Sequence, residues 1–463
     1  MRRAAVACAA AIAALAIPLV AAGTGSSPPK EGRPNIVVVL TDDQTLDSLP
    51  HDPPVMPYLQ RQVRTSGEWT RFTNAFVNTP LCCPSRATML TGLYSHHTGV
   101  EGNDEGADLD DSSTIATSLH DAGYRTGLVG KYLNNYPFDR GAYVPPGWDR
   151  FFAKENQSDA TVYGDYTVVD DGVVRTYGSG PRDYATDVLA REAVEFIRST
   201  PQQQPFLLFF APSASHAPWV PADRDAGAYA GMSIPDAPSV GEADVSDKPA
   251  WIRALPPVTE DQREEFRSDR RRGYETLRAV DAALRSIDDA LRLRGDYGDT
   301  VVFYLTDNGY ALGEHRWETK SCPYEPCVHI PFLVRVPGSS GGVDDRLVSN
   351  VDLAPTIAEL AGVRPARAQD GESLVAALRG AKPTTRTDVL LEFAGGGGVP
   401  GWSAVRTRSF LWVELDTGER ELYDLEGVLG PADPDQLVNL ADAPAYAGIR
   451  RRLASRLQAL RAG

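Results

Sequence analysis

Continuous apolar runs that alternate with helical patterns constrain the fold of this 463-residue chain more than any other feature. Residues 34–40 read Pro-Asn-Ile-Val-Val-Val-Leu, and similar runs occupy residues 206–210 and 301–305. Unbroken β-branched and aromatic runs are typical of strands that are covered on both faces, as in a parallel sheet. Shorter apolar runs at 127–130 and 332–336 fit the same sheet.

Between these runs, apolar residues recur at helical spacing over residues 113–122, 184–198 and 274–293. Strands that alternate with helices predict an α/β fold, with a large and mostly parallel sheet between two layers of helices. Ligands of such sheets bind beyond the carboxyl ends of the strands. We therefore expect the functional residues at those ends.

The sequence pattern changes near residue 376. This change predicts a large domain over 34–375 and a small α+β subdomain over 376–463. The later part shows short strand patterns joined by turns, followed by a helical pattern over 445–462. Residues 137–180 and 212–260 are rich in Pro, Gly and Asp and have weak periodicity. We expect these two segments to be long surface loops that wall a binding pocket.

The amino terminus predicts export. Basic residues at positions 2 and 3 precede an Ala-rich apolar stretch, and small residues near position 22 favour cleavage. We expect residues 1–22 to be a signal peptide and residues 23–33 a disordered leader. A membrane anchor is the alternative, but the Ala-rich run broken by Pro18 matches a spanning helix poorly. The mature protein is therefore expected to be secreted or extracytoplasmic, without stable membrane insertion.

The charge balance bears on partners. The chain carries 46 Lys and Arg against 62 Asp and Glu, a formal net charge of −16. Such a chain is a poor binder of nucleic acid or of anionic membrane surfaces. An anionic substrate would need local positive charge against this background.

Acidic and amide side chains follow two of the predicted strands. Asp42 and Asp43 come directly after the first, and Asp307 and Asn308 follow another. Oxygen ligands of this kind suit Ca²⁺ or Mg²⁺ rather than Zn²⁺. Ordinary strand-end turns are the alternative for either pair taken alone.

Residues 82–92 read Cys-Cys-Pro-Ser-Arg-Ala-Thr-Met-Leu-Thr-Gly, which resembles the signature of the type I sulfatases. In that family a maturation enzyme oxidises the first Cys to formylglycine, whose hydrate attacks sulfur. The resemblance implies that Cys82 becomes the nucleophile, that Arg86 steadies its hydroxyls, and that the Asp/Asn pairs named above hold one divalent ion, usually Ca²⁺. A plain thiol nucleophile is the competing interpretation, but thiol enzymes need a His partner rather than this string.

Three further sequence segments resemble sulfatase segments whose side chains bind the sulfate. They place Lys131 after a strand, His216 in Ser-His-Ala-Pro, and Lys320 at the end of residues 313–320. Fixed cations against a sulfate supply the electrostatic stabilisation that its transition state needs. His315, in the same block as Lys320, is expected to lie near the metal or the substrate.

One departure separates this chain from many arylsulfatases, which read Gly-Lys-x-His. Here the string is Gly-Lys-Tyr-Leu-Asn, so Leu133 stands where that family has a proton-relaying His. Asn134, or His315 through water, would have to replace it. The same string resembles the N-acetylglucosamine-6-sulfatase branch and implies an alkaline-phosphatase-like fold. The expected function is hydrolysis of sulfate monoesters on sulfated sugars, with the maturation enzyme as a second partner.

Two alternatives and one pairing stay open from the sequence. A phosphate or phosphonate ester hydrolase of the same superfamily would share the fold and the metal residues. A non-catalytic sugar-binding relative would have lost Cys82, Arg86 or a metal ligand, and each is present. Cys322 and Cys327 flank a short loop that a disulfide would close in an oxidising compartment, but sequence leaves their pairing undecided.

Overall fold

The computed structural model describes residues 32–49, 51–134, 136, 138–155, 159–381 and 386–462. The predicted signal peptide, residues 1–22, lies outside the described residues. In the part that is described, no helix combines the length and the apolar character that crossing a bilayer requires.

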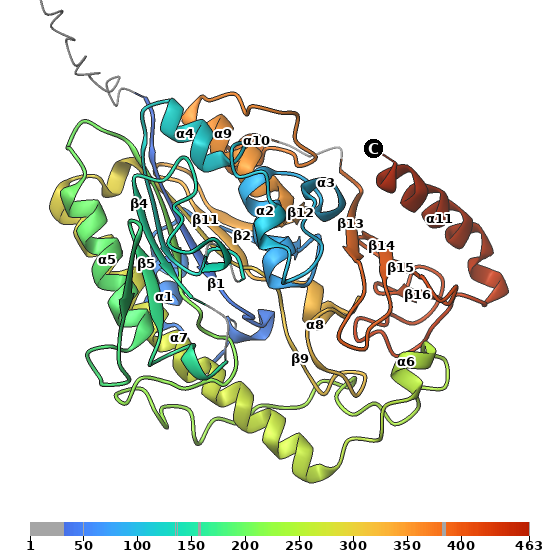
Figure 1. Ribbon diagram of the computed structural model, residues 1–463. Helices are drawn as coiled ribbons and strands as arrows, with labels where there is room; N and C mark the ends of the chain where they lie inside the picture. Colours follow the sequence, from blue (N-terminus) through green and yellow to red (C-terminus); the bar gives the residue numbers. More distant parts are fainter. Residues whose placement is uncertain are drawn as a thin grey trace, which may run out of the picture.

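A large mixed sheet forms the centre of the molecule (Figure 1). Its ten described strands are, in order across the sheet, β12 (Gly342–Ser349), β2 (Trp69–Phe76), β11 (Phe332–Arg335), β8 (Thr300–Thr306), β1 (Asn35–Thr41), β7 (Phe206–Ala211), β3 (Arg125–Gly130), β4 (Arg150–Lys154), β5 (Thr167–Asp170) and β6 (Val173–Thr176). The five neighbours β8, β1, β7, β3 and β4 run parallel. Their carboxyl ends therefore meet at one edge of the sheet.

The central strand β1 is buried along its whole length, as its apolar run predicts. Its side chains alternate between two cores: Ile36, Val38 and Leu40 face one, and Val37 and Val39 face the other. The first core is covered by α2 (Cys82–Thr91), α4 (Ile115–Asp121), α9 (Leu353–Ala361) and α10 (Val375–Leu378), and the second by α1 (Pro57–Thr65), α5 (Ala185–Ser199) and α7 (Glu260–Arg294). Figure 1 shows these helices on the two faces of the sheet. The predicted α/β class is confirmed.

A small antiparallel sheet follows in the carboxyl-terminal part. It consists of β13 (Asp388–Phe393), β14 (Trp402–Thr407), β15 (Phe410–Leu415) and β16 (Arg420–Asp424), with α11 (Ala447–Arg461) packed on one face. Residues on its other face, including Trp402 and Val413, belong to the first core of the large sheet. The predicted short strands and closing helix are confirmed, while the boundary at residues 375 and 376 stays a prediction.

The remaining α-helices and strands of the described residues are short. They are α3 (Ser95–Thr98), α6 (Ala250–Arg253), α8 (Glu325–Val328), β9 (Ala311–Leu312) and β10 (Glu318–Thr319). Cys322 and Cys327, which flank the start of α8, form a disulfide.

The expectation for residues 137–180 is wrong in part, because this segment contributes β4, β5 and β6 to the large sheet. β5 and β6 are four residues long, and β6 is exposed throughout, so they lack the apolar run that identified the central strands. Helix α7 also begins 14 residues before the expected position, at Glu260. Its first turns carry mostly exposed polar residues and start at a Thr259 capping box, where no apolar period is present to detect.

Candidate active site

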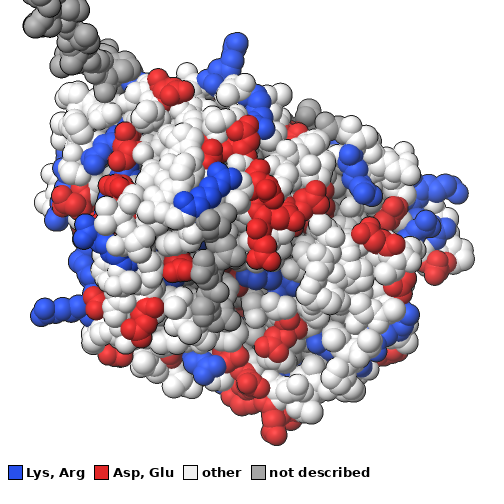
Figure 2. All heavy atoms as spheres, viewed as in Figure 1, with Lys and Arg blue, Asp and Glu red and all other residues white. Residues whose placement is uncertain are grey.

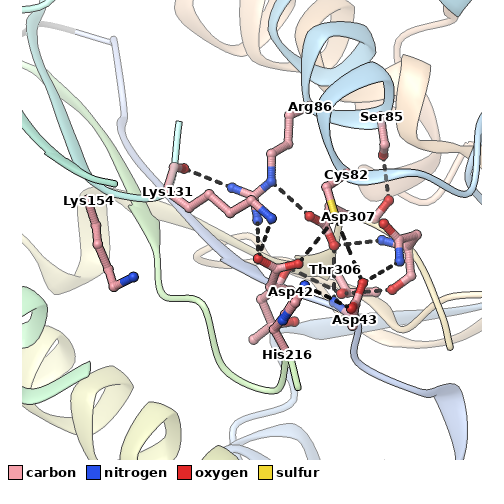
Figure 3. Close-up of polar contacts among 12 residues, drawn as sticks. Asp42, Asp43, Cys82, Ser85, Arg86, Lys131, Lys154, His216, Thr306 and Asp307 are labelled. Carbon is pink, nitrogen blue, oxygen red and sulfur yellow. Dashed lines mark hydrogen bonds and ion pairs between the residues drawn. The ribbon is translucent and has the colours of Figure 1, made fainter. Parts of the chain in front are cut away.

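Four of the predicted functional residues follow four neighbouring strands and lie close together (Figure 3). Lys131 follows β3, His216 lies in the loop after β7, Asp42 follows β1, and Asp307 follows β8. These strands are adjacent and parallel in the order β8, β1, β7, β3. The expectation that the polar residues share one sheet edge is therefore confirmed.

The carboxylates form a tight buried cluster. One ligand atom from each of Asp42, Asp43, Asp307 and Cys82 lies within 4.8 Å of the others, and all four residues are buried. The backbone N–H groups of Asp43 and Asn308 donate to Asp307 Oδ1 at 3.1 and 2.9 Å, which fixes that carboxylate. Asn308 donates to Asp43 Oδ1 at 2.6 Å, while its own Oδ1 is buried without a hydrogen-bond partner in the described structure.

The carboxylate and amide oxygens of this cluster suit a hard divalent cation as ligands. Carboxylate and amide oxygens are the ligands that Ca²⁺ and Mg²⁺ prefer, and a bound cation would offset the repulsion between buried carboxylates. The unpartnered Asn308 oxygen is the strongest single sign, because buried polar atoms are nearly always satisfied.

Helix α2 brings Cys82 and Arg86 to the same cluster. Leu81 precedes the helix in an extended conformation, and Pro84 occupies the first turn, where its missing N–H costs nothing. Cys82 Sγ lies 3.6 Å from Asp42 Oδ1. One turn later, Arg86 donates from Nε to Asp307 Oδ2 at 2.8 Å, as the spacing predicts.

The two lysines and His216 surround the acidic cluster. Lys131 Nζ donates to Asp42 Oδ2 at 2.7 Å. Lys320 Nζ lies 2.7 Å from Asp43 Oδ1 and 2.8 Å from Cys82 Sγ. His216 Nδ1 donates to the Ala217 carbonyl at 2.6 Å, which leaves Nε2 facing Asp43 Oδ2 at 3.5 Å.

Burial and charge set the protonation of this cluster. Burial alone would raise the pKa of Asp42, but the charges of Lys131, His216 and Arg86 outweigh it and hold the pKa far below its usual range. Burial also raises the pKa of Cys82 to about 12. An unmodified Cys82 is therefore a neutral thiol at physiological pH, which disfavours its use as a thiolate nucleophile.

The candidate His315 lies elsewhere, and so does Leu133, which stands where many arylsulfatases have His. His315 is buried, with Nδ1 bonded to Glu242 Oε2 at 2.7 Å and its ring 4.1 Å from that of Tyr324. Leu133 packs in the first core together with Cys83. His315 therefore makes its described contacts with Glu242 and Tyr324 rather than with the acidic cluster.

Sequence reasoning missed one cation near the cluster. Lys154 ends β4, the strand beside β3, and Figure 3 draws it next to Lys131. A single lysine in a segment of weak periodicity carries no signal of its own, so only the sheet order could reveal it.

Comparison with known proteins agrees with this geometry. A model of the family described as Sulfatase matches residues 34–363, and one described as N-sulphoglucosamine sulphohydrolase, C-terminal, matches residues 313–463. N-acetylglucosamine-6-sulfatase of Homo sapiens is 33% identical over 460 residues, covering 88% of this chain and 81% of that protein. An extracellular sulfatase SULF-1 homolog of Drosophila melanogaster is also 33% identical, but this chain spans only 32% of its length.

Solved structures show the same fold. A structure titled as BT4656 in complex with its substrate D-glucosamine-2-N,6-O-disulfate has a TM-score of 0.77, with 24% identity over 92% of this chain and 97% of that one. The phosphonate monoester hydrolase of Agrobacterium radiobacter has a TM-score of 0.74, with 24% identity over 93% and 96% of the two chains. The chain belongs to the sulfatase family and is a sulfuric ester hydrolase, and its relatives include N-acetylglucosamine-6-sulfatases.

Proposed function

We propose that this chain removes sulfate from sulfated sugars of the 6-O-sulfated glucosamine type, using formylglycine at position 82 and one divalent ion. The observation that carries the proposal is the position of Cys82. Cys82 is the first residue of α2. Its Sγ lies 3.6 Å from Asp42 Oδ1, 3.9 Å from Asp43 Oδ1 and 2.8 Å from Lys320 Nζ. A nucleophile in that position would meet a sulfate whose oxygens are held by cations.

The proposed metal ligands are Asp42, Asp43, Asp307 and Asn308. Ca²⁺ is the preferred ion and Mg²⁺ the alternative, since both take oxygen ligands. When bound, the ion would polarise the sulfate and stabilise the charge that develops on its oxygens. Arg86 remains paired with Asp307 and keeps that carboxylate oriented.

In the first chemical step, one hydroxyl of the hydrated formylglycine attacks sulfur, and a neighbouring carboxylate such as Asp307 accepts its proton. The bond between sulfur and the sugar oxygen breaks, and the sugar leaves as an alcohol after protonation by His216 or a lysine. Lys131 and Lys320 hold the sulfate oxygens during the transfer. The product of this step is sulfate esterified to residue 82.

In the second step, the other hydroxyl on the same carbon loses its proton and collapses to the aldehyde. The carbon–oxygen bond to sulfate breaks, sulfate leaves, and water restores the hydrate. The geminal hydroxyl makes release intramolecular, whereas a plain serine ester would need a separate water to attack.

A phosphonate ester hydrolase is the second candidate function. It is supported by the fold shared with the phosphonate monoester hydrolase of Agrobacterium radiobacter. The relatives at 33% identity are named sulfatases, and two lysines face the single acidic cluster, which favours sulfur. A non-catalytic, sugar-binding role is disfavoured because Cys82, Arg86 and the four proposed metal ligands are all present.

Export and maturation belong to the same proposal. The signal-like residues 1–22 and the relative named as extracellular support secretion. A formylglycine-generating enzyme is the expected partner, recognising the Cys-x-Pro-Ser-Arg string.

The proposal predicts that Cys82→Ala abolishes sulfate release and leaves the fold intact. The neighbouring Cys83 packs in the core and provides the matched control, so Cys83→Ala should retain turnover. The assay compares a 6-O-sulfated glucosamine with the corresponding phosphate ester, and mass spectrometry of the peptide spanning residue 82 detects the aldehyde. Full activity in the Cys82 variant, or only unmodified thiol in an active preparation, would contradict the mechanism.

A further inference from the structure

Lys154 is a buried lysine that forms no ion pair with a carboxylate among the described residues. Four lysines lie in the described residues, and the other three each form an ion pair: Lys131 with Asp42, Lys248 with Asp247, and Lys320 with Asp43. Lys154 is only 2% exposed, and its Nζ donates to the backbone carbonyl of Glu155 at 3.0 Å. Its charge is therefore the least compensated of the four.

The sheet places this charge at the reaction site. β3 and β4 run parallel with Gly130 opposite Ala153, so Lys131 and Lys154 follow a pair of facing residues. Figure 3 shows Lys154 beside Lys131, on the side away from Asp307. Burial, and then repulsion from the Lys131 charge, lower the pKa of Lys154 to about 7, while Asp42 and Glu155 act in the opposite direction.

A purely structural role does not account for this arrangement. The Lys154 ammonium lies 5.4 Å from the centre of the Tyr166 ring, a contact of about 0.5–2 kcal/mol. Removing a lone ammonium from water costs several kcal/mol, and a second lysine nearby adds repulsion. An anion from outside the chain that joined the two cations would offset this cost and favour the charged form of Lys154.

We propose that Lys154 binds a second sulfate group of the substrate, beyond the sulfate that is cleaved. The inference rests on the proposed function, since Lys131, Lys320 and His216 already face the position of the scissile sulfate. Lys154 ends β4, one strand further from the acidic cluster than Lys131, which follows β3. The chain would then favour multiply sulfated sugars.

The test compares glucosamine 6-sulfate with glucosamine 2-N,6-O-disulfate. The wild-type enzyme should prefer the disulfated sugar. Lys154→Met should lose about tenfold more kcat/KM on the disulfated sugar than on the monosulfated one, mainly through KM, as expected for a charge-assisted hydrogen bond. Lys154→Arg should keep most of the preference, because it keeps the charge.

Lys248→Met is the matched control, since Lys248 is equally buried but pairs with Glu242 and Asp247 outside the site. It should affect the two sugars alike. Equal losses on both sugars in Lys154→Met would overturn the inference, and so would a wild-type enzyme without any preference, a result that needs no variant to fold. A wild-type enzyme that releases sulfate from neither sugar would instead refute the proposed function.

Discussion

At the scale of single residues, the site is a cluster of opposite charges removed from water. Asp42, Asp43 and Asp307 are each at most 3% exposed, as are Arg86 and Lys131. Buried charges are tolerated only where they are paired and hydrogen-bonded. Here Arg86 pairs with Asp307, Lys131 with Asp42 and Lys320 with Asp43, at 2.7 to 2.8 Å. The cluster is therefore oriented before a substrate arrives, which is the condition for strong electrostatic catalysis.

Lys320 provides a test at this scale, because its Nζ lies 2.8 Å from the side chain that is expected to react. Replacing it with Met should lower kcat for sulfate ester hydrolysis by about 10²–10³, the usual cost of removing one preorganised donor to a developing oxyanion. Steady-state sulfate release measures the effect. Lys320→Arg should restore little, because a planar guanidinium does not reproduce a compact ammonium. A kcat close to that of the wild type would exclude Lys320 from transition-state stabilisation.

At the scale of elements, the parallel strands end at a common edge of the sheet. The residues that follow them are therefore brought close together. Gly130, the last residue of β3, has φ = 124°, and a Cβ there would lie 2.0 Å from the Ala211 carbonyl oxygen on β7. The close approach of the two strands lets the Lys131 N–H donate to that carbonyl at 2.8 Å. Glycine at this position therefore aims Lys131 at Asp42.

Gly130→Ala should destabilise the fold by at least about 2 kcal/mol and lower activity, because the strained φ and the steric clash act together. Gly418→Ala is the matched control, since Gly418 has φ = 84° but open space around its Cβ position. The control should lose only about 1–2 kcal/mol and keep its activity. Urea unfolding and sulfate release measure both effects, and equal behaviour of the two variants would show that the close approach of the strands is unimportant.

At the scale of the whole molecule, the small carboxyl-terminal sheet holds the segment that carries Lys320. Trp402 donates to the Ser321 carbonyl at 2.9 Å, and Arg406 Nε donates to Glu325 Oε1 at 2.8 Å. On the face that Figure 2 shows, acidic side chains form a band over the region of α2 and α3, and basic side chains are scattered. The buried cations therefore supply local positive charge for an anionic substrate against an acidic neighbourhood on this face.

The contact between Glu325 and Arg406 predicts how low pH affects the attachment of the small sheet to the segment that carries Lys320. Burial alone would raise the pKa of Glu325, but the Arg406 charge and the hydrogen bond from His329 lower it to about 2. A depressed pKa stabilises the folded state above the unfolded value of 4.5, and this contribution is lost as the pH falls towards 2. The contribution is at most about 3 kcal/mol.

Arg406→Met should remove the part of this contribution that comes from Arg406 and leave the part that comes from His329. The difference in unfolding free energy between wild type and variant should be largest at neutral pH and should shrink between about pH 4.5 and 2. Urea unfolding at a series of pH values measures this difference. A difference that stays constant with pH would mean that the ion pair does not stabilise the fold.

The sequence by its local patterns identified the family and predicted the residues of the site. The Cys-x-Pro-Ser-Arg string, the two acidic strand ends and the central apolar runs are local patterns, and local patterns can be recognised without knowing what folds against them. The sequence analysis did not predict strands β5 and β6 or the first turns of α7. Neighbouring elements stabilise them, and they show no apolar period of their own.

Which residues from distant segments meet depends on the tertiary structure. The pairing of β3 with β4 places Lys154 beside Lys131, and the small sheet joins Glu325 to Arg406 across 81 positions of sequence. His315 lies in the same block as Lys320 and yet contacts Glu242 instead of the acidic cluster. Non-local contacts depend on strand order and register, which are set by the packing of the whole chain and leave no mark on any single segment.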